Sequence, residues 1–313
     1  MNVNYHNKFP TGWFGVLFSD EIACEEVKAI KYFNKDYVVF RGKSGEVSIL
    51  DAHCPHLGAH LGGGTCEGET IKCPFHGWAF DMSGKCVDIP YCDRIPVKAK
   101  KGELKKYPVR ELNQVIHMWF DPNGNEPTWE IPEGEGMNGQ SGWTKWYFKR
   151  WRIKTQGKEI IENLVDGPHF AHVHHAPINT IEVSFDGHIA QQITTIKAHP
   201  SLTNDGSELK TDAVYYGPAV MHVNMLGKHK SVQINYHTPI DHEYVDLCYG
   251  LKLFRDPSLP DTGEIARDYA EAAHTSFAED VIIWENKIYR DNPLLCEDDG
   301  EIFQLRQWYS QFF

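Results

Sequence analysis

The sequence predicts an α+β protein in which an all-β N-terminal region precedes a second region that combines an antiparallel sheet with a long C-terminal helix. Three observations support this fold class. Residues 13–120 read as short strands separated by turns, residues 188–253 contain segments of alternating polar and apolar residues, and residues 264–289 contain neither Gly nor Pro. Alternation with a period of two is typical of strands with one buried face, whereas a long segment free of Gly and Pro is typical of a helix.

The N-terminal region is divided by turn residues. Turns are predicted at residues 34–36, 43–45 and 83–84. The last strand, residues 115–120, is followed by a stretch rich in Gly, Pro and Glu, residues 122–142. We therefore place the domain boundary in this stretch and expect two domains, residues 1–125 and residues 126–313.

The second region begins with a strand that leads into a helix. This helix is expected from Gly157 to about Val165, and Gly167–Pro168 disturbs it because proline does not fit a helix interior. The alternating segments from His188 to Leu253 suggest a broad antiparallel sheet. The long helix, from about Glu264 to Tyr289, follows this sheet.

Composition limits the possible classes of function. The chain has 313 residues, a net charge of −12 and no long basic run. Nucleic-acid binding is therefore not expected, because it requires a Lys/Arg surface that neutralises phosphates. The sequence shows neither an apolar run long enough to span a bilayer nor a signal peptide, so a cytoplasmic protein is expected. In such a protein, eight cysteines are more typical of metal ligands and buried thiols than of disulfides.

Two short motifs, Cys54-Pro-His56 and Cys73-Pro-Phe-His76, each place one thiolate and one imidazole on a tight loop. Two such loops can hold two irons, one through both sulfurs and the other through both imidazoles. Neutral imidazoles reduce the negative charge of the site, which raises the reduction potential to roughly −150 to +300 mV, against about −400 mV for a plant-type cluster. The residues therefore predict a [2Fe–2S] cluster bound by Cys54, His56, Cys73 and His76.

A structural zinc site is the alternative, since two Cys and two His also suit tetrahedral Zn²⁺. Zinc modules normally pair Cys with Cys and His with His, whereas both halves here are mixed and each contains a proline. These features favour the cluster. His60 could be proposed as a further ligand, but it is interpreted as an ordinary loop residue because the site already has four ligands. Cys66, Cys86 and Cys92 do not fit the ligand spacing and are interpreted as buried or surface thiols.

A second group of potential metal ligands lies in residues 163–175. Four histidines follow Asn163 and Asp166 there: His169, His172, His174 and His175. Spacing alone leaves the ligand pair open, because His169 and His172 would share a helix face while His169 and His174 need a bulge or a break. Such distortions are frequent at functional sites. A helix end with surface histidines is the competing interpretation.

The third ligand of a ferrous site would come from elsewhere in the chain. Non-haem iron that activates O₂ commonly uses two His and one carboxylate, which leaves positions open for oxygen. Asp280 is the candidate carboxylate, because it shares a helix face with Phe277 and Trp284. An unpaired aspartate among apolar residues is costly, and a metal would remove that cost. The alternative is that Asp280, which follows Glu279, is exposed.

The segment CPHLGAHLGGGTCEGETIKCPFHGW, residues 54–78, resembles the Rieske motif of the ring-hydroxylating and steroid-hydroxylating oxygenases. The family pattern Asn-x₂-Asp-x₂-His-x₄-His matches Asn163, Asp166, His169 and His174. The resemblance therefore implies a mononuclear Fe(II) bound by His169, His174 and Asp280, with His172 and His175 as non-ligands.

The same resemblance implies catalytic roles for Asp166 and Asn163. Asp166 can hydrogen-bond a ligand imidazole and fix its tautomer. In the family, the corresponding Asp also bridges to a cluster histidine of the neighbouring subunit, which implies a contact from Asp166 to His76 or His56 of another chain. The oligomer implied is a homo-oligomer, usually a trimer.

The resemblance extends to the C-terminus. IWENKIYRDNPLLCEDDGEIFQLRQWYSQFF, residues 283–313, is similar to the end of the oxygenase components of the 3-ketosteroid 9α-hydroxylase family. This implies a Rieske domain followed by a helix-grip catalytic domain, in which a long helix lies on an antiparallel sheet. Positions that match the family's substrate pocket are Leu164, Gln192, Tyr215, Met221, Asn235, Phe277 and Trp284.

The implied function is that of the terminal oxygenase of a multicomponent monooxygenase. It would use O₂ and NAD(P)H-derived electrons to hydroxylate a steroid or a similar polycyclic apolar substrate. The electron donor would be a ferredoxin reductase or a flavin/[2Fe–2S] reductase. Sterol C7-desaturases share the IWxNK-type ending, so sterol desaturation is the alternative, together with aromatic hydroxylation or demethylation on the same machinery. An electron carrier that kept only the cluster is a further hypothesis.

Overall fold

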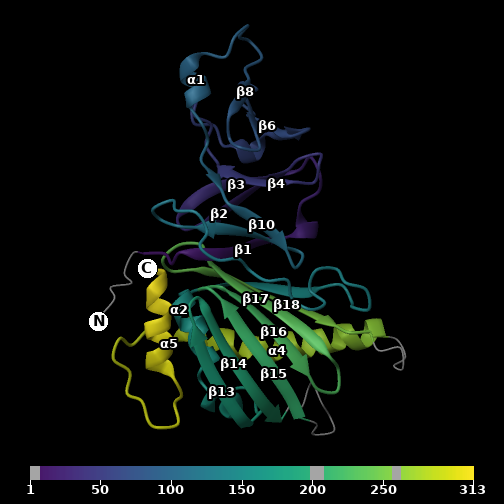
Figure 1. The fold of residues 1–313 in the computed structure, drawn as a ribbon, viewed down its shortest axis with the longest axis vertical. Coiled ribbons are helices and arrows are strands. Elements are labelled where there is room, and N and C mark those ends of the chain that lie inside the picture. Colours follow the sequence, from purple (N-terminus) through teal and green to yellow (C-terminus); the bar gives the residue numbers. More distant parts are fainter. Residues whose placement is uncertain (1–7, 198–207, 256–261) are drawn as a thin grey trace. The chain divides into compact units, whose positions relative to one another are not determined.

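The structure, a computed structural model, describes residues 8–197, 208–255 and 262–313, which form two units (Figure 1). The small unit is Gly15–Thr128, and the large unit combines residues 8–14 with Trp129–Phe313. Residues 8–14 therefore belong with the C-terminal part of the chain, whereas the sequence-based division places them in the N-terminal domain. In the part of the chain that the structure describes, no helix has the length and apolar character needed to cross a membrane.

The small unit consists of short antiparallel strands, as predicted. One four-stranded sheet has the order β2 (Val27–Tyr32), β3 (Lys35–Arg41), β4 (Val47–Asp51) and β9 (Lys106–Tyr107). The second has the order β5 (Thr65–Glu67), β6 (Thr70–Lys72), β7 (Ala79–Asp81) and β8 (Cys86–Asp88). A three-stranded sheet has the order β1 (Gly12–Phe18), β11 (Val115–Phe120) and β10 (Val109–Leu112). Three short helical segments complete this region: η1 (Ser19–Glu21), η2 (Leu61–Gly63) and α1 (Val97–Lys101).

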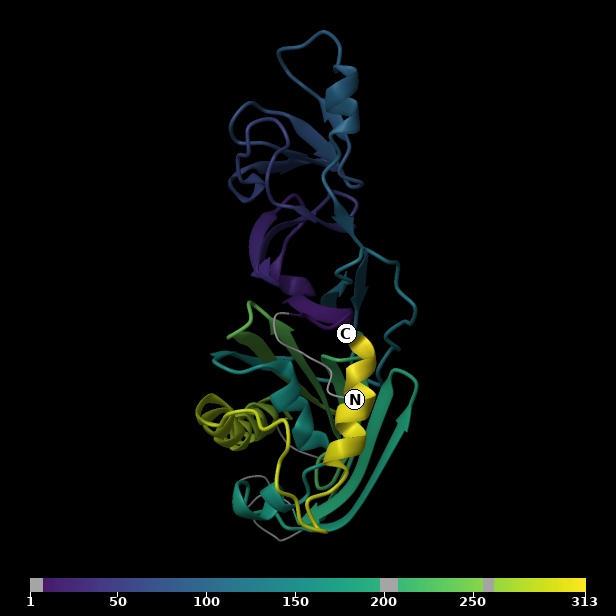
Figure 2. The ribbon, with the colours of Figure 1, turned by 90° about the vertical axis from the view of Figure 1, so that its left-hand side faces the viewer.

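The large unit is built on the predicted antiparallel sheet. Its seven strands have the order β12 (Tyr147–Ile153), β18 (Val245–Leu253), β17 (Ser231–Pro239), β16 (Val220–Leu226), β15 (Glu208–Tyr216), β14 (Ile189–Lys197) and β13 (Ile178–Asp186). The long helix α4 (Thr262–Asn286) lies across one face of this sheet (Figures 1 and 2) and packs on β12 and β18. The α+β class and the sheet-plus-helix arrangement are thus confirmed.

The helical segments before β13 differ from the prediction. The α-helix expected from Gly157 to about Val165 is α-helical only in α2 (Gly157–Ile161) and continues as the 3₁₀ helix η3 (Glu162–Leu164). Pro168 does not interrupt a helix but begins the next one, α3 (Pro168–His172), because the first helical position needs no N–H donor. The chain ends with α5 (Ile302–Tyr309) and η4 (Ser310–Phe312).

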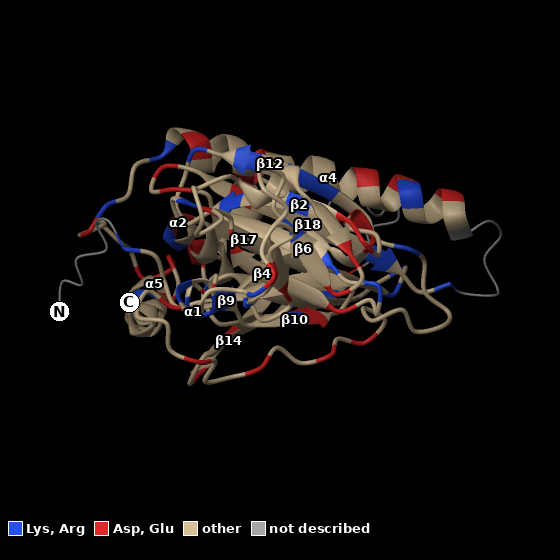
Figure 3. Ribbon diagram, turned by 90° about the horizontal axis from the view of Figure 1, so that it is seen from above, with Lys and Arg blue, Asp and Glu red and all other residues tan. Residues whose placement is uncertain are grey.

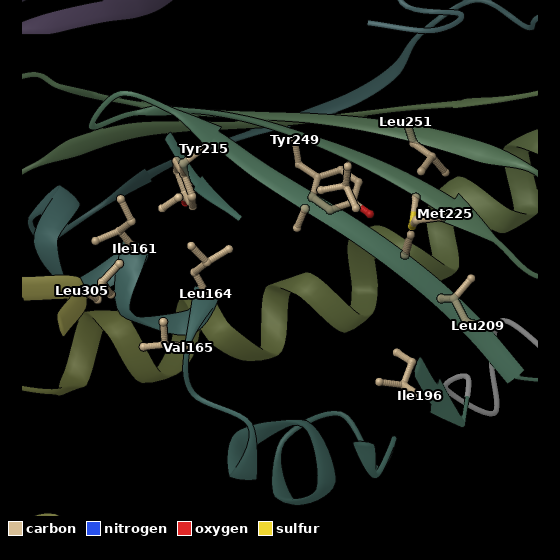
Figure 4. Close-up of a cluster of buried hydrophobic side chains, with 14 of the residues drawn as sticks. Ile161, Leu164, Val165, Ile196, Leu209, Tyr215, Met225, Tyr249, Leu251 and Leu305 are labelled. Atoms are coloured by element: carbon tan, nitrogen blue, oxygen red, sulfur yellow. The ribbon is translucent and has the colours of Figure 1, made fainter. Parts of the chain in front are cut away.

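The core of the large unit lies between the sheet, α4 and the segments α2 and η3. Figure 4 shows Tyr215 and Tyr249 of the sheet above α4, with Ile161 and Leu164 of α2 and η3 beside Tyr215. All four side chains are buried. The segment that carries the predicted ligand histidines is therefore anchored in the core immediately before it reaches them.

Candidate metal centres and substrate pocket

The two cysteine motifs form loops with the same backbone hydrogen bonds. The Cys54 carbonyl accepts from the Gly58 N–H at 2.9 Å, and the Cys54 N–H donates to the Ala59 carbonyl at 2.9 Å. Cys73 repeats the pattern with Gly77 at 3.0 Å and Trp78 at 2.8 Å. Gly58 and Gly77 have φ values of 78° and 72°, a conformation that favours glycine. Each cysteine is thus followed, four residues later, by the glycine that turns its loop.

These loops bring the four predicted cluster ligands together. Cys54 and Cys73 are both buried and belong to the same buried group of side chains. Burial, followed by the neighbouring Cys73, raises the pKa of Cys54 to about 11. The rings of His56 and His76 have centroids 4.7 Å apart. Two neighbouring buried thiols and two neighbouring imidazoles on the paired loops fit a [2Fe–2S] cluster ligated by Cys on one iron and His on the other.

A buried atom without a partner supports this fit. Among the described residues, Nδ1 of His76 has no hydrogen-bond partner although it is inaccessible to solvent. Buried polar atoms are normally hydrogen-bonded or metal-bound, because an unsatisfied one is costly. The ring of His56 stacks on Trp78 at 4.5 Å, and the Trp78 indole donates to the Tyr91 hydroxyl at 2.7 Å. The histidine pair is therefore held in place by its aromatic neighbours.

The other candidates on these loops have local structural contacts. The Nδ1 atom of His60 accepts from the Gly62 N–H at 3.0 Å and so caps η2. The Cys66 thiol donates to the Arg41 carbonyl at 3.5 Å, and burial raises its pKa to about 11. Cys86 is also buried, whereas Cys92 is exposed. These positions match their interpretation as loop and thiol residues.

In the large unit, His169, His174 and Asp280 lie together. One potential ligand atom from each of the three lies within 4.8 Å of the others. Asp280 is only 5% exposed, which excludes the alternative that it is a solvated helix residue. The helix α3 ends at His172, and His175 has a φ of 53°, so the break that an i, i+5 histidine pair requires is present. His172 and His175 are exposed.

The His169 ring is oriented by the residue three positions before it. Its Nδ1 atom lies 2.5 Å from the Asp166 backbone carbonyl, which can only accept, so Nδ1 carries the proton and Nε2 is left for a metal. The Asp166 carboxylate accepts from the His169 backbone N–H at 3.3 Å and lies 3.7 Å from Nδ1. The sequence predicts that the carboxylate fixes the tautomer, whereas in the structure the carbonyl of the same residue makes this contact.

The His174 ring has a carboxylate on each side. Its Nε2 lies 3.2 Å from Asp280, and its Nδ1 lies 3.1 Å from Glu279 and 3.3 Å from the Ser276 hydroxyl. Burial alone lowers the pKa of His174, but hydrogen bonds and charge from Asp280 and then Glu279 outweigh it, and the pKa is raised. Glu279 was missed as a functional residue in the sequence. The sequence feature that could have identified Glu279 is its position next to Asp280 on the helix.

A second missed feature fixes the segment before the histidines. Glu162 is nearly buried and accepts from Arg306 of α5 at 2.7 and 2.8 Å and from Lys287 at 3.2 Å. Lys287 also pairs with Glu159 of α2 at 2.9 Å. This network ties α2 and η3 to α5 and to Lys287, the residue that follows α4. It therefore holds Asn163, the next residue, at the pocket wall.

One pocket of the large unit is lined by the three metal-type ligands and by Asn163. All seven residues matched to the family's substrate pocket also line it: Leu164, Gln192, Tyr215, Met221, Asn235, Phe277 and Trp284. Most of the further lining is apolar: Ile160, Phe170, Ile196, Leu209, Ala213, Val223, Met225, Leu247 and Ala273. Its other polar side chains are Thr211, Gln233, Tyr249, Tyr269 and Ser276.

The sheet register explains how distant residues reach one pocket. Tyr215 pairs with Met221, Met221 with Asn235, and Asn235 with Tyr249, so these four residues form one row across β15, β16, β17 and β18. Paired residues in neighbouring strands point to the same face of a sheet. Gln192 is fixed at the edge of the pocket because its amide donates to the Leu164 carbonyl at 2.6 Å.

Comparisons with known proteins identify the class of protein. Residues 12–108 match the model of the Rieske [2Fe–2S] domain, and residues 118–313 match the 3-ketosteroid 9α-hydroxylase C-terminal domain. The fold is also that of solved Rieske oxygenases. Dicamba monooxygenase bound to dicamba superposes with a TM-score of 0.78 at 17% identity over 97% of each chain. Pseudomonas putida CBB5 NdmA with caffeine superposes with a TM-score of 0.76 at 20% identity, covering 95% of this chain and 89% of that chain. The chain is therefore a Rieske oxygenase.

Sequence relatives define the family more narrowly. A 3-ketosteroid-9-alpha-monooxygenase oxygenase component of Rhodococcus rhodochrous is 36% identical, over 98% of this chain and 83% of the relative. The corresponding protein of Mycobacterium tuberculosis (strain ATCC 25618 / H37Rv) is 30% identical, over 98% and 82%. A cholesterol 7-desaturase of Ciona intestinalis is 34% identical, over 97% and 69%. The chain belongs to the family of 3-ketosteroid 9α-hydroxylase oxygenase components, and its cofactor classes are the Rieske cluster and mononuclear iron.

Proposed function

We propose that this chain hydroxylates a steroid or a similar polycyclic, largely apolar substrate as the terminal oxygenase of a multicomponent monooxygenase. The observation that carries the proposal is the pocket of the large unit. Two histidines and a buried aspartate line the same pocket as the seven family-matched residues, and most of the remaining wall is apolar. Apolar pockets with a few fixed polar groups are typical of sites for apolar small molecules.

Cys54, His56, Cys73 and His76 would hold the cluster, and His169, His174 and Asp280 would hold the ferrous ion. When bound, the cluster supplies one-electron storage and the ferrous ion supplies open positions at which O₂ is activated. The chain's own residues prepare the iron site. His169 and His174 direct Nε2 toward it because Nδ1 of each is engaged, by the Asp166 carbonyl and by Glu279 respectively.

The pocket walls would orient the substrate. Phe277 and Trp284 lie on the same helix as Asp280, with ring centroids 5.7 Å apart, so they place flat apolar surface beside the ligands. On the opposite wall, Tyr215, Met221 and Asn235 share the row described above. Gln192 and Asn163 add polar groups near Leu164. Such a pocket favours a rigid apolar body with a small number of polar substituents.

The electron donor is proposed to be an NAD(P)H-dependent reductase, either a ferredoxin reductase or a flavin/[2Fe–2S] reductase, and the working form a homo-oligomer, expected to be a trimer. The side chain of Asp166 supports the oligomer, because it remains 39% exposed beside the iron ligand His169 and is accessible to a neighbouring chain. We expect it to contact His76 or His56 of that chain. Free thiols at Cys24, Cys92 and Cys296 support a reducing compartment, in keeping with the expected cytoplasm.

Sterol desaturation is a second candidate. It is favoured by the 34% identity to the cholesterol 7-desaturase of Ciona intestinalis, which equals that to several of the steroid monooxygenase components. The two reactions differ in the fate of oxygen. A product that retains the label from labelled O₂ indicates hydroxylation, whereas an unlabelled alkene indicates desaturation.

The proposal is tested by incubating the protein and a surrogate reductase with a panel of steroids, sterols and small aromatic compounds. Products are identified by mass spectrometry under labelled O₂. We expect conversion of at least one steroid with retention of the label. Conversion of a small aromatic compound while every steroid is left unchanged would refute the substrate class.

Iron content separates the oxygenase from an electron carrier. The cluster accounts for two irons per chain, so an oxygenase with its second site filled contains three. We expect about three irons per chain in protein purified anaerobically with added Fe(II). A value that stays at two, with the cluster spectrum intact, would favour the carrier.

A further inference from the structure

A basic surface lies beside the cluster loops of an acidic protein. The chain carries a net charge of −12, yet residues 94–106 contain six Lys or Arg and a single Glu. We call these six residues the basic ridge: Arg94, Lys98, Lys100, Lys101, Lys105 and Lys106. Three of them belong to α1, whose only buried residue is Ala99. Figure 3 colours Lys and Arg blue along α1 and β9. The net charge of the whole chain is negative, but the charge of this surface is therefore positive.

The charges of the ridge are available to a partner. All six side chains are exposed. No carboxylate of the described residues lies within ion-pair distance of Lys98, Lys100 or Lys101, whereas several other lysines of the small unit are paired, such as Lys35 with Asp51 at 2.6 Å. Unpaired like charges that are close in sequence repel one another, and an anionic surface removes that repulsion.

The helix that carries three ridge residues ends close to a cluster loop. A Cβ atom placed on Gly102, which caps α1, would lie 3.8 Å from Cβ of Pro55, the residue between Cys54 and His56. Ala99 and Leu104 belong to the same buried apolar group as Cys54 and Cys73. A protein seated on α1 would therefore lie close to the loop that holds Cys54 and His56.

We propose that the basic ridge is the docking surface for an acidic electron-transfer protein that carries its own [2Fe–2S] cluster. This proposal rests on the proposed function, in which the cluster receives electrons from outside the chain. One electron leaves the reduced partner and is taken up by the oxidised cluster of this chain. The histidine edge at His56 and His76 then remains free for the neighbouring subunit.

The choice of lysine favours a transient electron-transfer partner over a second copy of this chain. Lys is depleted from the cores of stable interfaces, because its hydrated ammonium is costly to bury. Electron-transfer complexes are small and short-lived, and complementary charges speed their formation without fixing one rigid geometry. Five of the six ridge residues are lysines, which suits such an encounter.

The test compares two charge reversals in the intact holoprotein. Lys98→Glu/Lys101→Glu alters the ridge, and Lys31→Glu/Lys43→Glu makes the same change in charge elsewhere on the small unit. Lys31 lies on β2, the edge strand opposite β9 in the same sheet, and Lys43 lies in the turn after β3. The probe is an acidic plant-type [2Fe–2S] ferredoxin, measured first for binding in its oxidised form and then for its rate of cluster reduction.

At low ionic strength we expect the ridge variant to bind this ferredoxin with an affinity about tenfold or more below that of the wild type. We expect its cluster to be reduced by the ferredoxin more slowly by a similar factor. The difference should shrink as salt screens the charges. The control variant should stay close to the wild type. Reduction by methyl viologen radical cation should not slow in either variant, because a cation gains nothing from a basic surface. Equal effects in both variants, or slowing by both reductants, would overturn the proposal.

Other occupants give different results. If the ridge joined copies of this chain, the variant would change its oligomeric state in light scattering. If it bound a membrane, the variant would lose sedimentation with phosphatidylserine vesicles while ferredoxin binding was unchanged. Either outcome rejects the electron donor as the occupant. Because binding and reduction are measured without substrate, failure of the steroid assignment leaves this test unaffected.

Discussion

The cluster loops and the iron site hold their ligands in different ways. The four cluster ligands belong to one continuous segment, residues 54–76, whose two loops repeat the same hydrogen bonds around Cys54 and Cys73. The iron site combines His169 and His174, at the end of a short helix, with Asp280 from α4. Local backbone geometry forms the first site, whereas packing between elements that are distant in sequence forms the second. Substitutions should therefore act on the two sites independently.

The largest expected effect comes from removing the iron ligand that packing supplies. In Asp280→Ala, we expect loss of the third iron and a fall in product formation of about a thousandfold or more, since metal-assisted chemistry needs the side chains that bind the metal directly. The visible spectrum of the cluster should not change. Iron analysis and product assay on the same sample measure both results. Glu285→Ala, at an exposed position five residues later on the same helix, is the control. Normal turnover by Asp280→Ala would disprove the ligand assignment.

At the cluster site, Gly64→Ala should disrupt the loops that hold the ligands. A Cβ atom on Gly64 would lie 2.0 Å from the backbone carbonyl oxygen of Lys72, so Gly64→Ala requires the loops to move apart. We expect destabilisation of the small unit by more than about 4 kcal/mol, the range of severe backbone conflicts, and loss of cluster absorbance per chain. On the neighbouring Gly63, a Cβ atom would meet only Pro74 at 3.8 Å, an ordinary contact. Gly63→Ala should therefore retain its cluster, and equal loss in both variants would contradict this account.

The same contrast explains what the sequence could predict. The four cluster ligands were predicted from spacing and residue type, because their site is local and its glycines belong to the motif. The ligand pair His169 and His174 was not determined by spacing, since a regular helix would have favoured His172. The structure ends α3 at His172, and this break depends on the surrounding packing rather than on a local pattern.

Residues that act through other residues were the hardest to predict. Glu279 looks like an ordinary charged residue of an amphipathic helix, and its role depends on a ring from a segment about a hundred residues earlier. Glu162 is similar, because its partners Arg306 and Lys287 are far away in the chain. The helix predicted over 157–165 was wrong in its second half, which is 3₁₀. The predicted strands, in contrast, follow from alternation and turn residues that are local, and the structure contains them, although β13 lies outside the segments for which strands were predicted.

A smaller effect is expected at the carboxylate behind His174. Glu279→Gln keeps a hydrogen-bond acceptor near Nδ1 but removes the charge that favours a strongly donating imidazole. Substitution of a residue that hydrogen-bonds a metal-binding histidine typically costs about 10–100-fold in metal affinity. We expect a loss in this range for Fe(II) at the second site, measured by metal titration, with the cluster unchanged. Glu285→Gln is the matched control. If Glu279→Gln bound Fe(II) as tightly as the control, Glu279 would have no positioning role.

The smallest expected effect is a difference between the two units in how much stability each loses as the pH falls. Burial lowers the pKa of His117 in the small unit to about 4, and in the large unit it lowers the pKa of His237 to about 3 and of His274 to about 4. An unfolded histidine titrates near pH 6.5, so between about pH 6.5 and 4 the unfolded chain binds a proton that the native chain excludes. Stability therefore falls as the pH falls, by up to about 1.4 kcal/mol per pH unit for each histidine.

Burial also lowers the pKa of His188 in the large unit, whereas the raised pKa of His174 acts in the opposite direction. Because lowered values outnumber the raised one among its described histidines, the large unit should lose stability faster than the small unit. Hydrogen exchange of amides in β18 and β11 at pH 7.0 and 5.5 separates the two units. The His274 ring lies 5.2 Å from the ring of Tyr249 in β18. Because asparagine cannot titrate, His274→Asn should reduce the loss in β18 between these pH values by about 1 kcal/mol. His117→Asn should do the same in β11 and leave β18 unchanged. If both substitutions changed both strands equally, the units would unfold together, and the independence inferred from the two metal sites would not extend to their folding.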